Sequence, residues 1–194
     1  MFRVRRRQVS AGILALLSVM SPGVRAAPQA EILDYGYYQF TGESERLANP
    51  NVTTGYVARG EAELVEKTQS IPIKRGRLFG FRFRIDGMNK NVGVIPLQLI
   101  VEHPKMNRPD GSTSTGYSYQ VDLKLKDGKV EDKTGYRLNE PFELVEGDWR
   151  FVYKFMNKVL MEQKFTTFLP EKVMPEKGMS KENPEDRIET ESQS

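Results

Sequence analysis

The chain has 194 residues, no cysteine and one histidine, which excludes a cysteine nucleophile, an iron–sulfur centre and a multi-histidine metal site. It carries 29 basic and 26 acidic residues, a net charge of +3, but five of the arginines lie in residues 1–26. The rest of the chain therefore has 24 basic against 26 acidic residues, and this net charge of −2 makes nucleic acid a poor candidate partner.

Residues 1–26 have the pattern of an export signal. Arginines within residues 3–7 precede an apolar run of 12 residues at 9–20, which is shorter than the about 20 residues that span a bilayer. Small residues at 24 and 26 predict cleavage after Ala26. The Arg6-Arg7 pair leaves a twin-arginine route open beside general secretion. We expect a periplasmic or secreted protein whose mature chain has no transmembrane segment.

Residues 27–170 are predicted to form one domain of strands, because apolar side chains recur there with a period of two. The clearest runs are 79–85, 117–125 and 149–156. Further strands are expected at 32–40, 55–68, 94–102, 134–144 and 159–167. Asp127-Gly128 predicts a tight turn, and Asn157-Lys158 is expected to turn the last hairpin.

About eight strands with one apolar and one polar face indicate an all-β fold, an immunoglobulin-like antiparallel sandwich. A small β-barrel is the alternative. The alternating aromatic residues predict the core, with Trp149 as its anchor: Phe79, Phe81, Phe83, Trp149, Phe151 and Phe165.

Several short motifs follow one another in an order that resembles a known bacterial family. They are Tyr35-Gly36, Ile71-Pro72 with Gly76, Phe79-Gly80, His103-Pro104, Glu143-Leu144 with Gly147-x-Trp149-x-Phe151, and Phe165. This order resembles the family of the domain of unknown function 3859, over roughly residues 31–168. The resemblance implies an envelope or secreted domain and no particular activity.

Basic residues are concentrated before and within the strand at 79–85, at Lys74, Arg75, Arg77, Arg82 and Arg84. Arg82 and Arg84 share one strand face and are candidates for binding an acidic protein or lipid phosphates. The alternative is a solvated face that pairs with Glu61, Glu63 and Glu66 on a neighbouring strand.

His103 and Asp110 are the other candidate binding residues. His103 follows an apolar strand and could act as a base or as a pH-sensitive contact, or its ring could simply fix the following turn. Asp110 lies in the longest polar loop, residues 104–116, and binding sites at the ends of sandwiches often lie on such loops.

An acidic cluster precedes the strand that begins at Trp149: Glu140, Glu143, Glu146 and Asp148. Paired carboxylates could hydrolyse glycosides, but acidic residues at a turn between strands are usually solvated. A hydrolase is therefore one alternative function.

The main functional expectation is a non-enzymatic exported protein that binds another envelope protein. A module that binds carbohydrate or lipid head groups is the second alternative. We predict no catalytic residue, no cofactor and no metal. Residues 171–194 are polar and lack aromatic residues, so we expect a disordered tail there.

Overall fold

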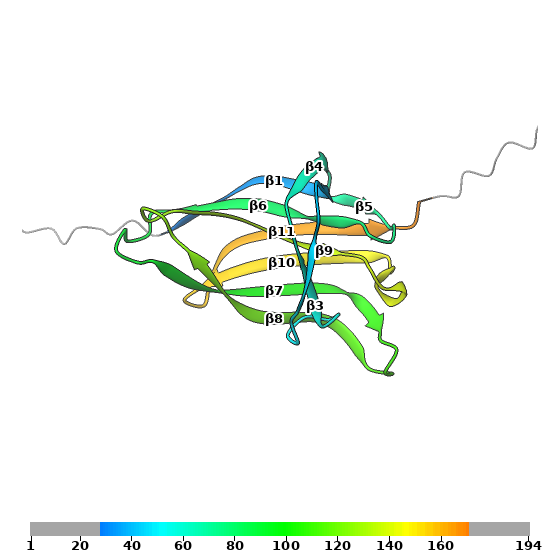
Figure 1. Cartoon of the computed structure of the whole chain (residues 1–194). Helices are drawn as coiled ribbons and strands as arrows, with labels where there is room; N and C mark the ends of the chain where they lie inside the picture. The colour runs from blue at the N-terminus through cyan, green and yellow to red at the C-terminus, as the bar shows by residue number, and fades with distance from the viewer. Residues whose placement is uncertain (1–27, 171–194) are drawn as a thin grey trace, which may run out of the picture.

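The computed structural model describes residues 28–170, in which two sheets pack face to face (Figure 1). The predicted export signal at 1–26 and the predicted disordered tail at 171–194 lie outside the described residues. The first sheet has the strand order β4 (Ala62–Glu66), β1 (Gln29–Phe40), β6 (Leu78–Asp86), β9 (Val130–Arg137). The second has the order β5 (Ser70–Pro72), β11 (Lys158–Phe168), β10 (Gly147–Phe155), β7 (Val94–Asn107), β8 (Thr113–Lys124).

A separate hairpin joins β2 (Glu45–Ala48) to β3 (Tyr56–Arg59), and one short 3-10 turn, η1 (Pro141–Glu143), precedes β10. Strands pair antiparallel throughout the described residues, except that β5 runs parallel to β11. The predicted immunoglobulin-like sandwich is confirmed. The barrel alternative is wrong, because each sheet ends in its own edge strands and the two do not join.

Residues 28–170 form eleven strands instead of about eight. Two short strands, β2 and β5, were not predicted. The single strand expected at 55–68 is divided into β3 and β4 by Gly60 and Glu61. Only β4 belongs to the sandwich, where it pairs with β1.

The core between the sheets is aromatic at its centre. All six aromatic side chains predicted for the core are at most 1 % exposed: Phe79, Phe81, Phe83, Trp149, Phe151 and Phe165. The ring of Phe79 packs edge-on against Trp149, with 5.1 Å between the ring centroids, and so joins the two sheets. The indole Nε1 of Trp149 donates to Thr167 Oγ1 at 3.2 Å, which satisfies its buried polar atom.

Two tight turns have the positive φ angles that fit the twist of antiparallel strands. The last hairpin turns at Met156 and Asn157, with φ of 48° and 63°, one residue earlier than predicted. Asp127 and Gly128 form the predicted turn, with φ of 53° and 75°. That turn carries the chain from β8 in one sheet to β9 in the other.

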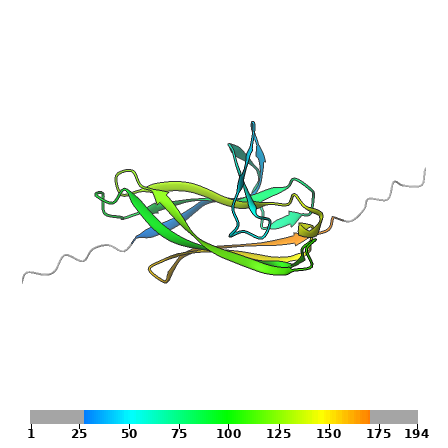
Figure 2. The same ribbon diagram turned by 60° about the horizontal axis from the view of Figure 1, so that its bottom comes forward.

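The β2–β3 hairpin crosses the strands of the sandwich at a steep angle (Figures 1 and 2). Phe40 pairs with Ala62, so the chain leaves the sheet after β1 and returns to it in β4. The tip of the hairpin is buried at Val52 and Thr53. Because Thr53 contacts Ser114 of β8, the tip reaches the open side of the sandwich, where β8 and β9 are the edge strands.

Candidate functional site

Arg82 and Arg84 lie on the outer face of β6, where ion pairs engage both guanidinium groups. Arg82 Nε is 2.8 Å from Asp34 Oδ2, and Arg84 Nη2 is 2.6 Å from Glu31 Oε2. Arg84 also lies within 4 Å of the carboxylates of Asp86 and Glu131. Glu31, followed by the other carboxylates, raises the pKa of Arg84. Both guanidinium groups are thus already paired with carboxylates of the fold itself.

The pairing with Glu61, Glu63 and Glu66 that we considered for these arginines is wrong. β6 lies between β1 and β9, and the acidic partners come from those strands and from β6 itself. Glu63 and Glu66 belong to β4, which is separated from β6 by β1. Periodicity in the sequence indicates the face of a strand but not its neighbours.

His103 lies inside β7 and not at its end, because the strand continues to Asn107 across a bulge between Glu102 and Met106. Its ring is buried beside Trp149, at 5.2 Å between ring centroids. The carbonyl oxygen of Pro104 is 2.8 Å from Nδ1, so Nδ1 carries the hydrogen and Nε2 is the acceptor.

Thr53 Oγ1 lies 2.7 Å from His103 Nε2 and donates to it. Ser114 Oγ lies 3.0 Å from the Thr53 hydroxyl, within the same buried group of hydrogen-bonded side chains. Burial lowers the pKa of His103, with a further contribution from the charge of Arg108. A buried neutral ring with both nitrogens engaged anchors the β2–β3 hairpin and gives a substrate no access to a base.

Asp110 lies in the tight connection between β7 and β8. Its carboxylate accepts hydrogen bonds from Ser112 Oγ at 2.6 Å and Ser112 N at 2.9 Å, and these bonds hold the pKa of Asp110 below its usual range. The polar loop predicted at 104–116 is mostly strand, since pairing between β7 and β8 extends to Asn107 and Thr113. Asp110 stabilises this turn and lies in neither of the two pockets described below.

The acidic cluster does not form a pair of free carboxylates. Glu143 is buried, accepts a hydrogen bond from Tyr136 and is bound by the backbone N–H groups of residues 139 and 140. Burial raises the pKa values of both Glu143 and Tyr136. Glu146 accepts from Leu169 N, and Asp148 from Thr166 Oγ1, each at 2.8 Å. Glu143, Glu146 and Asp148 are each held by a different structural partner, and this arrangement lends the hydrolase alternative no support.

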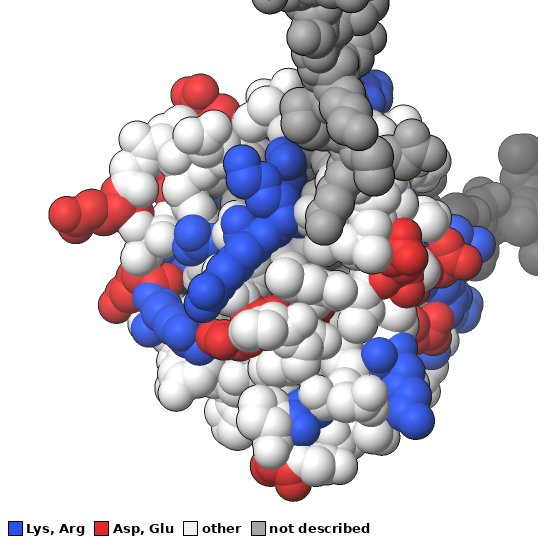
Figure 3. Space-filling model, turned by 90° about the vertical axis from the view of Figure 1, so that its right-hand side faces the viewer, with Lys and Arg blue, Asp and Glu red and all other residues white. Residues whose placement is uncertain are grey.

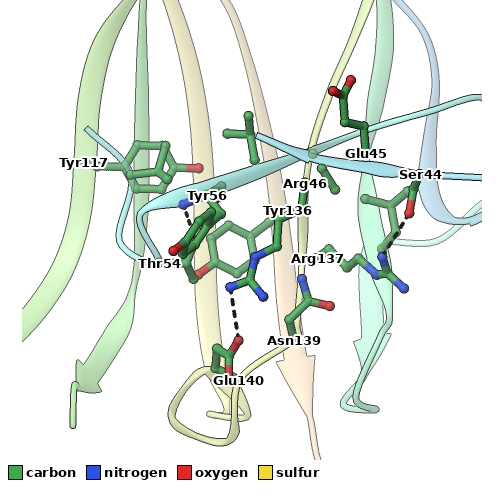
Figure 4. A pocket seen from close by; sticks show the side chains of 15 residues that line it. Ser44, Glu45, Arg46, Thr54, Tyr56, Tyr117, Tyr136, Arg137, Asn139 and Glu140 are labelled. Atoms are coloured by element: carbon green, nitrogen blue, oxygen red, sulfur yellow. Dashed lines mark hydrogen bonds and ion pairs between the residues drawn. The ribbon is translucent and has the colours of Figure 1, made fainter. Parts of the chain in front are cut away.

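A pocket of about 170 Å³ lies between the β2–β3 hairpin and the edge strand β9 (Figure 4). Its hairpin wall includes Ser44, Glu45, Arg46, Thr54 and Tyr56. Its other wall comes from the sandwich and includes Tyr117, Tyr136, Arg137, Asn139 and Glu140. Its polar lining therefore contains three phenols, two guanidinium groups, two carboxylates, two aliphatic hydroxyls and one side-chain amide.

Arg46 is held between a ring and a carboxylate at this pocket. Its guanidinium carbon lies 4.0 Å above the ring centroid of Tyr56, and its Nη2 is 3.3 Å from Glu140 Oε1. The pair is monodentate and half exposed, so it contributes little stability, about 0–1 kcal/mol. A guanidinium in this state retains free donors.

Arg137 has no carboxylate partner among residues 28–170. It is positioned by long contacts to Gly76 O at 3.3 Å and Ser44 Oγ at 3.5 Å, and its guanidinium lies over the ring of Phe40. It thus presents a second cation at the same pocket as Arg46.

The turn between β5 and β6 adds further cations beside this pocket. Arg75 Nε donates to Asn139 O at 2.8 Å, which joins that turn to the pocket wall. Lys74 precedes Arg75, and neither forms an ion pair with a described residue. Figure 3, which views the molecule from the right of Figure 1, shows a band of Lys and Arg side chains on this end. We call Arg46, Lys74, Arg75 and Arg137 the basic end.

Sequence reasoning identified Lys74 and Arg75 but missed Arg46, Tyr56 and Arg137. Arg46 and Glu140 are 94 residues apart in the chain, and no local pattern links them. The turn residues Asn49, Pro50 and Asn51 were the available signal for a hairpin between residues 45 and 59.

Within residues 28–170, no three histidine or acidic side chains gather in a group that could hold a metal ion. The same part of the chain contains no helix that is long and apolar enough to cross a membrane.

The model of the family described as "Domain of unknown function (DUF3859)" matches residues 26–167. No curated protein matches the chain significantly. Among solved structures, an immunoglobulin-like protein from Pseudomonas aeruginosa is 24% identical, with a TM-score of 0.51, over 75% of this chain and 100% of that chain. This likeness shows the fold alone.

Two other similar structures are much more distant. An alkylpurine DNA glycosylase from Pseudomonas fluorescens is 8% identical, with a TM-score of 0.32, over 51% of this chain and 27% of that chain. A β-glucosidase from Listeria innocua is 11% identical, with a TM-score of 0.35, over 56% of this chain and 17% of that chain. Neither likeness supports a functional argument.

Proposed function

Because the chain belongs to the DUF3859 family, whose description states no activity, we propose a function from its own surface. We propose that it is an exported, non-enzymatic binding protein whose partner is another envelope protein with an acidic segment. The observation that carries this proposal is the basic end, where Lys74, Arg75 and Arg137 form no ion pair with a described residue and Arg46 forms only an exposed one.

Guanidinium groups match the planar geometry of a carboxylate, which they bind through two parallel N–H donors. Arg46 already contacts one carboxylate oxygen of Glu140, and this contact marks the position that an aspartate or glutamate of the partner would take. Arg137 lies at the same pocket and forms no ion pair with any described residue.

A carbohydrate site is less well supported, because sugars stack on free aromatic faces. Near this end two tyrosine rings are already covered by cations. Arg46 lies 4.0 Å from the ring centroid of Tyr56, and Arg77 lies 4.2 Å from that of Tyr37. Arginine on an aromatic ring is stabilised by the ring quadrupole, so a sugar would have to displace it.

Cross-linking in cells tests the proposal. A photo-cross-linking amino acid replaces Tyr56, whose side chain is 46 % exposed at the pocket. We expect an adduct with one envelope protein, and we expect the cross-linked peptide of that protein to contain Asp or Glu. Arg137→Glu should remove the adduct, because it places a negative charge where the acidic segment binds.

Arg82→Glu is the control, because it makes the same charge reversal at an exposed arginine on the outer face of β6, which has a partner of its own and lies outside the pocket. The adduct should survive this change. A photo-cross-linker in place of Lys164, exposed on β11, should not yield the same adduct. An adduct that persists in Arg137→Glu but is lost in Arg82→Glu would mean that the basic end is not the binding surface.

A further inference from the structure

The end of the sandwich opposite the basic end carries a larger and mostly apolar pocket. It has a volume of about 1000 Å³ and lies among the β6–β7 connection, β7, β8 and the β10–β11 hairpin, at the left of Figure 1. Ile95 and Leu97 form its buried floor, and Met88, Val92, Tyr119 and Phe155 are partly buried around it.

Apolar side chains stand in solvent around this pocket. Met156 is 81 % exposed, Val159 56 % and Val94 47 %. Met156 also occupies a turn position with φ of 48°, which favours Asn, Asp or Gly over a long apolar residue. Neither the turn nor the core therefore explains a methionine here, whereas a contact outside the molecule does.

Four lysines lie on the segments that form this end: Lys90 in the β6–β7 connection, Lys124 in β8, Lys154 in β10 and Lys158 in β11. Lys154 lines the pocket, Lys124 pairs with Val94 across the β7–β8 ladder, and Lys158 pairs with Phe155 beside the turn. None of the four forms an ion pair with another residue of 28–170.

Carboxylates do not neutralise this end. Asp86 is engaged by Arg84 and Lys129, which leaves Asp122 and Asp127 against the four lysines. Exposed apolar side chains within a ring of lysines are typical of surfaces at a bilayer interface, where apolar groups enter the acyl region and ammonium groups stay among the head groups.

The position of the N-terminus agrees with such a contact. Pro28, the first described residue, lines this same pocket. With the predicted cleavage after Ala26, the mature chain would begin one residue before Pro28, so its terminal ammonium group would add positive charge near this end.

We propose that this end of the sandwich docks on an anionic lipid bilayer, with Met156 and Val159 among the acyl chains and the four lysines at the phosphates. The proposal does not depend on what binds at the basic end. The β5–β6 turn, which carries Lys74 and Arg75, and the β10–β11 hairpin lie at opposite ends of the sandwich (Figure 1). The two pockets are neighbours, since Tyr119 of the larger pocket stacks on Tyr117 of the smaller one with 6.1 Å between ring centroids.

Co-sedimentation with vesicles tests this inference. The exported protein is mixed with phosphatidylcholine vesicles that do or do not contain phosphatidylglycerol. We expect binding to the anionic vesicles only, weakened by added salt because exposed charges are screened. Met156→Asn with Val159→Thr should weaken binding about tenfold or more, since two apolar side chains no longer leave water.

We expect the Met156→Asn, Val159→Thr variant to fold, because Asn is favoured at the positive φ of position 156. A second variant, Lys154→Glu with Lys158→Glu, should also weaken binding about tenfold or more. Lys74→Glu with Lys105→Glu is the matched control, because both lysines are exposed outside the apolar pocket. We expect this control to bind as the wild type does.

Three results would overturn the inference. The first is equal binding to both kinds of vesicle, or none to either. The second is loss of binding in the Lys74 and Lys105 control while the Met156 variant still binds, which would place the lipid at the basic end. The third is a dimer in solution that Met156→Asn dissociates, because a second copy of the chain would then cover the apolar surface.

Discussion

The contact between Thr53 and His103 is a specific point at which the stability of the β2–β3 hairpin can be tested. Thr53→Val keeps the shape of the side chain and removes its hydroxyl. His103 Nε2 then loses the donor at 2.7 Å while it stays buried, and the other hydroxyl, Ser114 Oγ, is 3.5 Å away. A buried acceptor without a donor costs about 1–3 kcal/mol.

Urea denaturation should show a loss of about 1–2 kcal/mol in the free energy of unfolding, since the added methyl group offsets part of the cost. Hydrogen exchange should locate the effect. Amides of β2 and β3 should exchange about 5–30-fold faster, while those of β6 should change less, because the hairpin is anchored at its tip by this contact.

Thr54→Val is the matched control, because the same change occurs at the next residue. The Thr54 hydroxyl bonds only within the exposed turn, where it donates to Tyr56 O at 2.9 Å and accepts from Tyr56 N at 3.4 Å. We expect its loss to cost less than about 0.5 kcal/mol. Equal effects of the two substitutions, or unchanged exchange in the hairpin after Thr53→Val, would refute the role of His103 as its anchor.

Three further outcomes are expected. Trp149→Ala should lower the free energy of unfolding by about 3–5 kcal/mol in urea denaturation, because the indole is 1 % exposed in the core; a loss under about 1 kcal/mol would contradict this. Because the folded pKa of His103 is lowered below its unfolded value, its contribution to stability is full above about pH 6.5 and is lost as the pH falls through the folded pKa. His103→Gln should remove this contribution from the dependence of the free energy of unfolding on pH. The contribution of Glu143, which has the opposite sign, should remain in both proteins. Identical stability–pH profiles of the two proteins would exclude His103 as the source of the effect. N-terminal sequencing of protein from the periplasm should begin at Ala27, and a chain that keeps Met1 in the cytosol would contradict the export prediction.

The alternation of side chains along single strands could be predicted from the sequence, because it is a local property of extended backbone. The inward row from Phe79 to Phe83 and the outward position of Arg82 and Arg84 follow from it directly. The turns at Asp127-Gly128 and beside Asn157 were also marked locally, by residues that tolerate positive φ. In the last hairpin the two residues with positive φ are Met156 and Asn157, one residue earlier than the predicted pair Asn157-Lys158.

The sequence by itself therefore determined the fold class, the members of the core and the family resemblance. Only the tertiary structure decided which strands are neighbours, and with them the partners of Arg82 and Arg84 on β1 and β9. It also decided that Arg46 pairs with Glu140 and lines the same pocket as Arg137, because the β2–β3 hairpin leaves its sheet and crosses to the opposite edge. Such contacts depend on the packing of segments distant in sequence, and local periodicity contains no information about them.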